Sequence, residues 1–358
     1  MEKIIGLLDL DYFYAQCELL RNPSLKGKPV VIVMPSLREN SGAVATCNYE
    51  ARAKKICSGM PLSLAKKLGG AETIFINVDK PYYEELSRRV FEAVDFFCDK
   101  VEQVSIDEAY FDLSNPSGYE KAEEMGKKIK QRVKSEIGLT CSLGIGPNKL
   151  IAKMASSAKK PDGFFVVKPM EVSNFLSKQK VSSLFGVGPK TESVFKKQGI
   201  MLVSDIKKFS KKDLVEWLGE ANGARIYDFA FGRDEREIEP NREKQQLSRM
   251  MTIKQDSRDY DFVVSNVDFL SELLYKQILD LKKQFRTVSL VIVTDKMDTL
   301  TKSKTSQDHI SSLDELKNIE HDLLKEFLGE SISTVRRVGV RVSNFDEGAG
   351  FQRKLFDY

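Results

Sequence analysis

Three acidic residues have the types and positions that metal-dependent phosphoryl transfer requires. Asp9 closes the apolar segment 3–10, and Asp107 and Glu108 form a turn inside the apolar segment 101–113. Carboxylates brought together cannot all stay ionised without cations, and their hard oxygens suit Mg²⁺. Two such ions about 3.5–4 Å apart can clamp the attacking and leaving oxygens of an in-line displacement. Taken singly, a turn-capping Asp and an Asp-Glu pair in a surface hairpin would be the commoner explanation.

A second group of residues has the chemistry of a triphosphate cradle. Tyr49 and Arg52 are three residues apart on an expected helix, 48–56, so they share a face, and Thr46 lies just before them. Hydroxyl groups beside a guanidinium bind phosphate oxygens well, and Lys160 would add a further positive charge.

Two further stretches are able to hold a nucleic-acid backbone without reading its sequence. Gly186-Val187-Gly188 followed by Lys190 is similar to a helix-hairpin-helix turn, where backbone N–H groups and a lysine approach phosphates. In residues 248–343 the basic residues lie mostly in or beside expected strands and the acids in expected helices or loops, which favours one basic sheet face. These basic residues are Arg249, Lys254, Lys302, Lys304, Arg336, Arg337 and Arg341.

Each of these signals also has a plainer explanation. A surface ion pair between Glu50 and Lys54 would leave Tyr49 and Arg52 merely flanking it. A Gly-x-Gly turn is usually a connection between helices, and basic residues on strands are usual on a solvated sheet.

The composition limits the class of protein. A chain of 358 residues is too long for one ordinary core and indicates two to four domains. Its 41% hydrophobic and 30% charged residues are typical of a globular protein, and its longest apolar runs are too short to span a bilayer. Five cysteines without a CxxC pair favour a reducing cytoplasm, and two histidines argue against a His-rich zinc site.

The order of expected elements brings the acids into one sheet. Strands are expected over 3–10, 101–113 (two strands), 139–145 and 164–167, and helices over 80–97, 118–137 and 148–158. Strand, helix, two strands, helix, strand is the order of a split βαβ, ferredoxin-like sheet. In such a sheet the first strand and the later hairpin lie side by side at the centre.

Changes of pattern divide the rest of the chain. The segment 21–78 is inserted after the first strand, with a strand expected over 29–34 and a helix over 61–68. Residues 168–233 are expected to be helical, and the polar, proline-containing segment 234–247 is expected to be a linker. Residues 248–343 return to strand–helix–strand–strand–helix–strand order.

Several multi-residue motifs resemble the Y family of DNA polymerases, and among them the DinB-like, polymerase-IV type with an archaeal-like character. Asp9–Ala15 (DLDYFYA) and Ser105–Tyr110 (SIDEAY) resemble its two catalytic motifs, and Gly42–Arg52 resembles its nucleotide-binding finger motif. Residues 144–149, 158–163 and 335–341 are similar to further family motifs. The motifs occur in the family's order from residue 3 to the C-terminus, which makes the resemblance specific.

The resemblance implies an α+β multidomain fold shaped as a right-hand polymerase, with domains that agree with the pattern above. These are a ferredoxin-like palm (1–20 and 79–167), small fingers (21–78), a helical thumb with a helix-hairpin-helix (168–233), a linker (234–247), a C-terminal α/β little-finger domain (248–343) and a tail (344–358). It also implies template-directed DNA synthesis by two-metal phosphoryl transfer, with low-fidelity translesion bypass of damaged template bases. Two Mg²⁺ ions per active site, or Mn²⁺ in their place, would be the cofactors.

The resemblance also implies partners and a location. Primer-template DNA and dNTPs would be the substrates of a cytoplasmic enzyme that is a monomer and has no membrane attachment. The end of the tail is similar to a peptide that docks on a PCNA-like sliding clamp, although it lacks the second terminal aromatic residue of such peptides. The clamp-binding residues would be Gln352, Leu355, Phe356 and Tyr358.

Residue roles follow from the same resemblance. Asp9, Asp107 and Glu108 would ligate the metal ions together with the Leu10 carbonyl. Tyr14 would be the steric gate that rejects a ribose 2′-hydroxyl, with Phe13 beside it as the alternative gate. Nucleotide contacts would come from Phe13, Tyr14, Thr46, Tyr49, Arg52 and Lys160, beneath a roof of small residues at Ala43, Ala45 and Gly59. DNA contacts would come from Gly186, Gly188, Lys190, Arg249, Arg336 and Arg337.

Two other functions are compatible with the acids alone. A nucleotide cyclase also places two acids on a ferredoxin-like sheet, but it would not explain the helix-hairpin-helix, the polar linker or the last domain. A non-catalytic DNA-binding scaffold descended from a polymerase would have no reason to keep buried carboxylates that repel one another.

Overall fold

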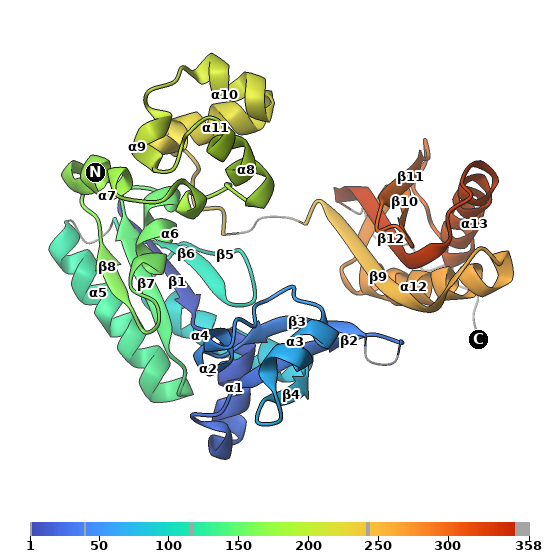
Figure 1. Ribbon diagram of the computed structural model, residues 1–358, viewed down its shortest axis with the longest axis horizontal. Helices are drawn as coiled ribbons and strands as arrows, with labels where there is room; N and C mark the ends of the chain where they lie inside the picture. The colour runs from blue at the N-terminus through green and yellow to red at the C-terminus, as the bar shows by residue number, and fades with distance from the viewer. Residues whose placement is uncertain (1, 39–40, 115–117, 241–243, 348–358) are drawn as a thin grey trace. The chain divides into compact units, whose positions relative to one another are not determined.

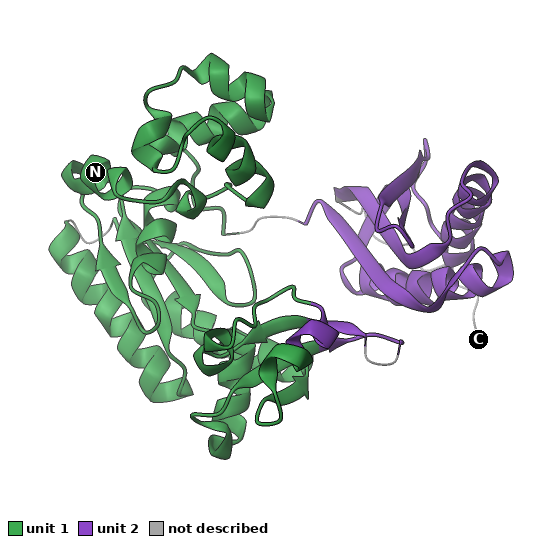
Figure 2. Ribbon diagram, viewed as in Figure 1, with its two compact units in different colours: residues 1–33, 44–60, 66–242 green, residues 34–43, 61–65, 243–358 purple. Residues whose placement is uncertain are grey.

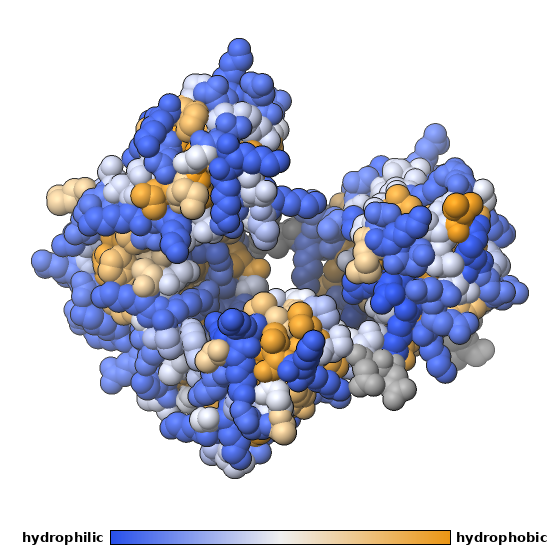
Figure 3. Space-filling model, in the orientation of Figure 1, coloured by the Kyte–Doolittle hydropathy of each residue, from blue (hydrophilic) through white to orange (hydrophobic). Residues whose placement is uncertain are grey.

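The computed structural model describes residues 2–38, 41–114, 118–240 and 244–347 (Figure 1). By its internal contacts the chain forms two compact units, residues 1–33, 44–60 and 66–242, and residues 34–43, 61–65 and 243–358 (Figure 2). The face seen in Figure 3 is mostly hydrophilic, with hydrophobic residues in smaller patches. Among the described residues, no helix combines the length and the apolar character needed to cross a membrane.

A five-stranded sheet with the order β5-β6-β1-β7-β8 forms the centre of the first unit. Its strands are β1 (Ile5–Leu10), β5 (Val101–Gln103), β6 (Glu108–Asp112), β7 (Cys141–Gly146) and β8 (Phe164–Val166). Strand β1 lies between β6 and β7 and is antiparallel to both. The expected place of the first strand, beside the hairpin at the centre of the sheet, is therefore confirmed.

Helices pack on both faces of this sheet. Helix α4 (Lys80–Asp95) and helix α5 (Tyr119–Arg132), which a π-helical turn extends, share the large core with Leu8 and Leu10 of β1. Helix α6 (Lys149–Ala158) covers the other face. The three helices expected from the apolar periodicity are confirmed.

The face under α6 changes from apolar to acidic along β1. Ile5 and Leu7 pack with Tyr110 of β6 and Ala152 of α6. Asp9 comes next on the same face, since successive strand residues alternate. Helix α6 approaches closely because β7 has Gly144, where a Cβ atom would lie 2.1 Å from the carbonyl oxygen of an α6 residue.

The segment inserted after α1 (Phe13–Arg21) contains a three-stranded sheet with the order β3-β2-β4. Its elements are β2 (Val30–Pro35), β3 (Gly42–Cys47), α2 (Tyr49–Ala53), α3 (Leu62–Gly69) and β4 (Ile74–Asn77). The sequence predicts β2, α2 and α3 but misses the two edge strands. Strand β3 is built largely of Gly and Ala, which have low strand propensity, and β4 has only four residues.

Residues 168–233 are helical, as expected, and share a hydrophobic core with Leu150, Ile151, Met154 and Ala155 of α6. The helices are α7 (Val172–Ser177), α8 (Pro189–Lys197), α9 (Val203–Ile206), α10 (Lys211–Leu218) and α11 (Glu220–Ala230).

The first part of the expected linker is docked on the first unit. Asp234 accepts a hydrogen bond from the N–H of Leu150 at 2.9 Å, and Ile238 packs against the apolar part of β1. The N–H of Glu239 donates to Glu102 at 2.8 Å, and Glu102 is in a buried ion pair with Lys149. Because these polar groups find partners on the sheet and α6, residues 234–239 do not run free as a polar linker would.

The second unit contains a four-stranded antiparallel sheet with the order β11-β10-β12-β9. Its elements are β9 (Gln246–Ser257), α12 (Tyr260–Asp280), β10 (Lys283–Thr294), β11 (Thr299–Thr305), α13 (Leu313–Glu330) and β12 (Val335–Glu347). The expected strand–helix–strand–strand–helix–strand order is confirmed. Both helices pack on one face of the sheet and share its core.

A carboxyl group is buried between these two helices. Glu320 of α13 has no exposed surface, and one of its oxygens is hydrogen-bonded to Ser271 of α12 while the other has no partner. Burial raises the pKa of Glu320 from 4.5 to about 8, with Asp268 raising it further and Ser271 and Lys317 opposing. Glu320 is therefore protonated in the folded protein at neutral pH.

This burial predicts a pH-dependent stability. The pKa of Glu320 is higher in the folded than in the unfolded protein. The free energy of unfolding is therefore highest below pH 4.5 and falls as the pH rises toward 8. A change of one pKa unit equals about 1.4 kcal/mol, so the loss between pH 4.5 and 7 amounts to about 3 kcal/mol. Glu320→Gln should remove this slope in calorimetric melts across pH, whereas Asp322→Asn, an exposed control on the same helix, should keep it. Equal slopes in all three proteins would contradict the assignment.

Candidate active site

Asp9 and Glu108 face each other across two neighbouring central strands. They are direct partners in the ladder between β1 and β6. The N–H of Leu10 donates to the carbonyl of Asp107 at 2.8 Å, which ties the turn to the end of β1. Burial raises the pKa of Asp9, Lys160 opposes this shift, and the negative charges of Glu108 and Asp107 add to it. Asp107 and Glu108 are half-buried and follow the exposed Val104 and Ser105 in the hairpin between β5 and β6.

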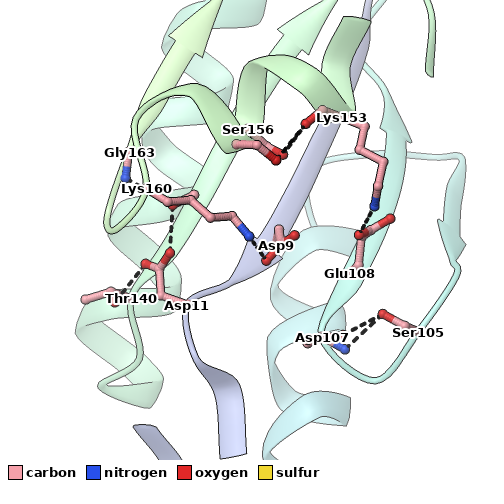
Figure 4. A network of polar contacts seen from close by, with 12 residues as sticks. Asp9, Asp11, Ser105, Asp107, Glu108, Thr140, Lys153, Ser156, Lys160 and Gly163 are labelled. Carbon is pink, nitrogen blue, oxygen red and sulfur yellow. Dashed lines mark hydrogen bonds and ion pairs between the residues drawn. The ribbon is translucent and has the colours of Figure 1, made fainter. Parts of the chain in front are cut away.

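Two lysines neutralise these acids (Figure 4). Lys160 pairs with Asp9, and Lys153 of α6 pairs with Glu108. Asp107 accepts a hydrogen bond from the Ser105 hydroxyl at 2.6 Å. In the part of the chain that the structure describes, no three acidic, His or Cys side chains converge on one point as in a formed metal site.

The donor set nevertheless fits hard divalent cations. All the candidate ligands are oxygens, and they come from two adjacent strand ends. The two neutralising groups are ammonium groups on long, flexible side chains, which can turn away without any movement of the backbone. The ammonium groups of Lys160 and Lys153 already pair with Asp9 and Glu108 in this structure.

A cavity of about 380 Å³ opens beside the acids. It brings together Asp9, Leu10 and Asp107 of the predicted metal ligands with the predicted sugar gate and triphosphate cradle, from segments far apart in the sequence. The residues that line it are Asp9, Leu10, Tyr12, Phe13, Tyr14, Ala45, Thr46, Tyr49, Arg52, Ser58, Ile106, Asp107 and Lys160. Glu108 is not among them; it pairs with Lys153 and lines a different cavity.

The predicted gate residue is held by an aromatic stack. The rings of Tyr14 and Tyr83 are 4.6 Å apart and inclined by 21°. Tyr83 is fully buried, and its hydroxyl donates to Glu18 at 2.7 Å. Phe13 is only 3% exposed, whereas Tyr14 is half-buried and lines the cavity. Tyr14 is therefore the more open of the two candidate gates.

The predicted phosphate cradle is formed around the start of α2. The Asn48 side chain caps this helix at the N–H of Ala51, with a distance of 3.1 Å. The guanidinium of Arg52 lies 4.8 Å from the centre of the Tyr49 ring, and its Nε donates to the Cys47 carbonyl at 3.2 Å.

The alternative surface pair of Glu50 and Lys54 is wrong. Lys54 instead pairs with Glu72 and donates to the Gly69 carbonyl at 3.0 Å.

Sequence reasoning missed Lys153, Ser58 and Tyr83. For Lys153 the available signal is its spacing of four from Lys149, which places both lysines on one face of α6. Ser58 and Tyr83 have no comparable local signal, because the place of Ser58 at the cavity and the stacking of Tyr83 on Tyr14 depend on how distant segments pack.

The predicted helix-hairpin-helix residues lie in the turn ahead of α8. Gly186 has a φ of 90°, a left-handed conformation that favours glycine, and Gly188 caps the helix. Lys190 is exposed in the first turn of α8. The element before the turn is a short 3₁₀-helix, Val181–Ser183, rather than a full α-helix.

The expected basic sheet face of the second unit is wrong for three residues. Lys302 pairs with Glu330 of α13 at 2.6 Å, and Arg249 donates to Gln277 of α12 at 3.0 Å. Lys304 lies 4.0 Å from Asp322 of α13. These side chains point to the helix-covered side, because the strands alternate and the helices supply acidic or amide partners there.

The other basic residues differ in their surroundings. Arg337 and Arg341 alternate with the buried Val338, Val340 and Val342, so they lie on the open face of the sheet. Arg336 follows the irregularity in β12 and lies 3.4 Å from Asp256. The predicted clamp-binding residues Gln352, Leu355, Phe356 and Tyr358 lie outside the described residues.

Comparison with known proteins decides the family. Residues 8–157 match the impB/mucB/samB family, and residues 244–355 match the C-terminal domain of that family. The chain is 39% identical to DNA polymerase IV of Methanosarcina acetivorans, with 100% of both chains covered. It is 36% identical to DNA polymerase IV of Nitrosopumilus maritimus, with 99% of both covered. The chain belongs to the DinB-like Y family of DNA polymerases.

Solved Y-family structures confirm the fold class. The Y-family DNA polymerase chimera Dbh-Dpo4(243-245)-Dbh is 30% identical, with a TM-score of 0.90 over 96% of this chain and 100% of that chain. The insertion ternary complex of Dbh DNA polymerase is 31% identical, with a TM-score of 0.70 over 96% of this chain and 100% of that chain. The α+β right-hand polymerase fold, with palm, fingers, thumb and little finger, is thus confirmed for this Y-family chain.

Proposed function

We propose that this chain is a DNA-directed DNA polymerase that extends a primer at the cavity beside Asp9. The observation that carries the proposal is that one cavity joins strand-end carboxylates to hydroxyl groups and a guanidinium. Carboxylates hold metal ions, whereas hydroxyl groups and a guanidinium bind phosphates. A nucleoside triphosphate is the substrate that needs both. Family membership supports divalent-metal dependence, primer-template DNA and dNTPs as the setting of this chemistry.

Asp9, Asp107 and Glu108, with the Leu10 carbonyl, would hold two divalent ions, Mg²⁺ or Mn²⁺. Such ions lower the pKa of an attacking hydroxyl and neutralise charge that develops on phosphate oxygens. Strands β1 and β6 present the ligands from adjacent ends, so little backbone movement is needed to bring them together.

The remaining cavity residues would hold and select the nucleotide. Arg52 offers a planar fork of donors for phosphate oxygens, and the hydroxyl groups of Thr46 and Tyr49 add neutral donors. Lys160 lines the same cavity as Asp9, so its ammonium group is able to turn from the carboxylate to a phosphate. The ring of Tyr14 would exclude a 2′-hydroxyl.

Small residues at the cavity would lower fidelity and permit lesion bypass. Ala45 and Ser58 line it, and neither fills much volume beside a nascent base pair. A loose enclosure rejects a wrong shape weakly, because discrimination needs contacts or clashes that differ between right and wrong substrates. The same space accommodates a damaged template base.

Primer extension tests the proposal directly. The full chain is incubated with Mg²⁺, dNTPs and a primer on either an intact template or one with an abasic site. Extension past the abasic position is expected. Release of cyclic nucleotide and pyrophosphate without DNA would instead indicate a cyclase, and DNA binding without any product would indicate a scaffold. Mn²⁺ in place of Mg²⁺ is expected to support extension as well.

Arg336 and Arg337 are proposed phosphate ligands of the second unit. Replacing both by Ala should weaken DNA affinity about equally for all sequences and lower the slope of log affinity against log salt by up to about two contacts. Arg337 should contribute more, because Arg336 has Asp256 at 3.4 Å. Lys302→Ala is the matched control, since Lys302 pairs with α13. A slope as steep as that of the unmodified chain would assign both arginines to contacts within the unit.

The tail is proposed to dock on a sliding clamp. Deleting residues 352–358 should leave synthesis without clamp unchanged and remove stimulation by a PCNA-like clamp, because a short docking peptide carries its own anchors. A matched deletion that keeps Gln352, Leu355, Phe356 and Tyr358 but removes 348–350 should retain stimulation. If the clamp stimulates the chain without residues 352–358 as strongly as the full chain, the clamp contact lies elsewhere in the protein. The monomeric state and the cytoplasmic location stay predictions, and sedimentation tests the first.

A further inference from the structure

Asp11 is a buried acid that the proposed chemistry does not use. It is 1% exposed, although it lies only two residues beyond Asp9. Its carboxylate accepts hydrogen bonds from the Ser142 hydroxyl at 2.7 Å, the Asp162 N–H at 2.8 Å and the Thr140 hydroxyl at 3.1 Å. All three donors are neutral, so the charge of Asp11 is held by oriented dipoles rather than by an ion pair.

These contacts connect β1 to the loop that carries Lys160. The loop joins α6 to β8, and the backbone N–H of its Asp162 donates to Asp11. The next residue, Gly163, donates to the same Ser142 hydroxyl at 3.2 Å. Asp162 has a φ of 51°, an uncommon conformation for a residue other than glycine, so its contacts must hold the backbone there.

The other side of the loop is held by α5 and the π-helical turn that extends it. Lys130 and Lys134 pair with the Asp162 carboxylate at 2.7 and 3.1 Å, and Lys130 also donates to the Gly163 carbonyl at 3.0 Å. These bonds tie the loop to a helix on the outer layer. The bond from Asp11 ties it to β1, the strand that also carries Asp9.

We propose that Asp11 is a positioning residue that holds the loop so that Lys160 projects into the nucleotide cavity. Because the loop is held in place, the Lys160 side chain starts from a fixed backbone position, from which it reaches Asp9 and would reach a bound triphosphate. The inference rests on the proposed role of Lys160 as a triphosphate ligand. A carboxylate is needed because its two oxygens accept three donors, whereas the NH₂ group of an asparagine would face one of those donors.

The experiment is a double-mutant cycle on the full chain with Asp11→Asn and Lys160→Ala. The kcat and the KM for a dNTP are measured in single-nucleotide insertion, with DNA affinity and a melting curve for every variant. Asp11→Asn should raise KM about tenfold and change kcat less, and the double variant should be no worse than Lys160→Ala alone. Asp162→Asn, which removes the pairs with α5 but keeps the N–H, should raise KM less than Asp11→Asn does.

The outcomes separate this inference from the proposal beneath it. If Lys160→Ala leaves KM unchanged, the triphosphate role of Lys160 fails. If Lys160→Ala raises KM but Asp11→Asn does not, or if the two effects simply multiply, only the positioning role of Asp11 is overturned. Should Asp11→Asn fail to fold, Ser142→Ala, which removes a donor to Asp11 and the acceptor of Gly163, must raise KM in the same Lys160-dependent way.

Discussion

Asp107→Ala is expected to abolish primer extension while leaving DNA affinity unchanged. Asp107 is a proposed ligand shared by both metal ions, and a two-metal site that loses a shared ligand can no longer clamp both reacting oxygens. The fold should tolerate the change, because the Asp107 backbone carbonyl keeps its bond to the Leu10 N–H and the half-buried side chain is hydrogen-bonded to the exposed Ser105. Extension rates, DNA binding and melting curves are measured together at saturating Mg²⁺.

Two matched variants sharpen this experiment. Asp107→Asn keeps the shape and the possible bond to Ser105 but removes the charge, and it should be as inactive as the alanine variant. Asp107 directly precedes β6, and Asp112→Ala removes an acid at the far end of that strand and should retain activity. If the Asp107→Ala variant extends primers at nearly the rate of the unmodified chain, Asp107 is not a catalytic residue.

Tyr14→Ala is expected to let the enzyme incorporate ribonucleotides with a large gain in the ratio of rNTP to dNTP efficiency. The ring lines the cavity and is held in place by its stack on Tyr83, with ring centres 4.6 Å apart. A ring fixed in this way leaves no space for a 2′-hydroxyl, and the rejection is steric, so removing the ring removes it. Tyr14→Phe keeps the ring and should keep the discrimination against rNTPs.

The melting curve decides between a gate and a core aromatic. Truncating a fully buried large aromatic costs about 3–5 kcal/mol, and half-buried Tyr14 should cost less. A large melting shift with unchanged sugar selectivity would make Tyr14 a core residue and move the gate to Phe13. Phe13→Ala is the companion variant, and since Phe13 is 3% exposed it should chiefly destabilise the protein.

Local patterns were sufficient to locate the three candidate acids and most of the palm. An acid that closes an apolar strand is visible in the sequence, because a strand end presents its last side chain without help from distant segments. The order of strands and helices then restricts the sheet to few topologies, and a ferredoxin-like sheet places Asp9 beside Glu108. The edge strands β3 and β4 were missed, because half of β3 is Gly or Ala, which have low strand propensity, and β4 has only four residues.

The partners of the charged residues were decided by the tertiary structure alone. Lys302 was expected on a basic face but reaches Glu326 and Glu330, which no periodicity indicates. The docking of residues 234–239 likewise depends on acceptors and donors of α6 and β5 that polarity alone does not show.

The sequence by itself determined which residues of this protein are able to do chemistry and which strands carry them. Only the tertiary structure decided what holds them in place. The buried Asp11 accepts a hydrogen bond from the backbone N–H of Asp162, 151 positions away, and Glu108 is neutralised by Lys153, 45 positions away. Side-chain type and strand period are local properties, whereas burial and hydrogen-bond partners depend on which distant segments pack together.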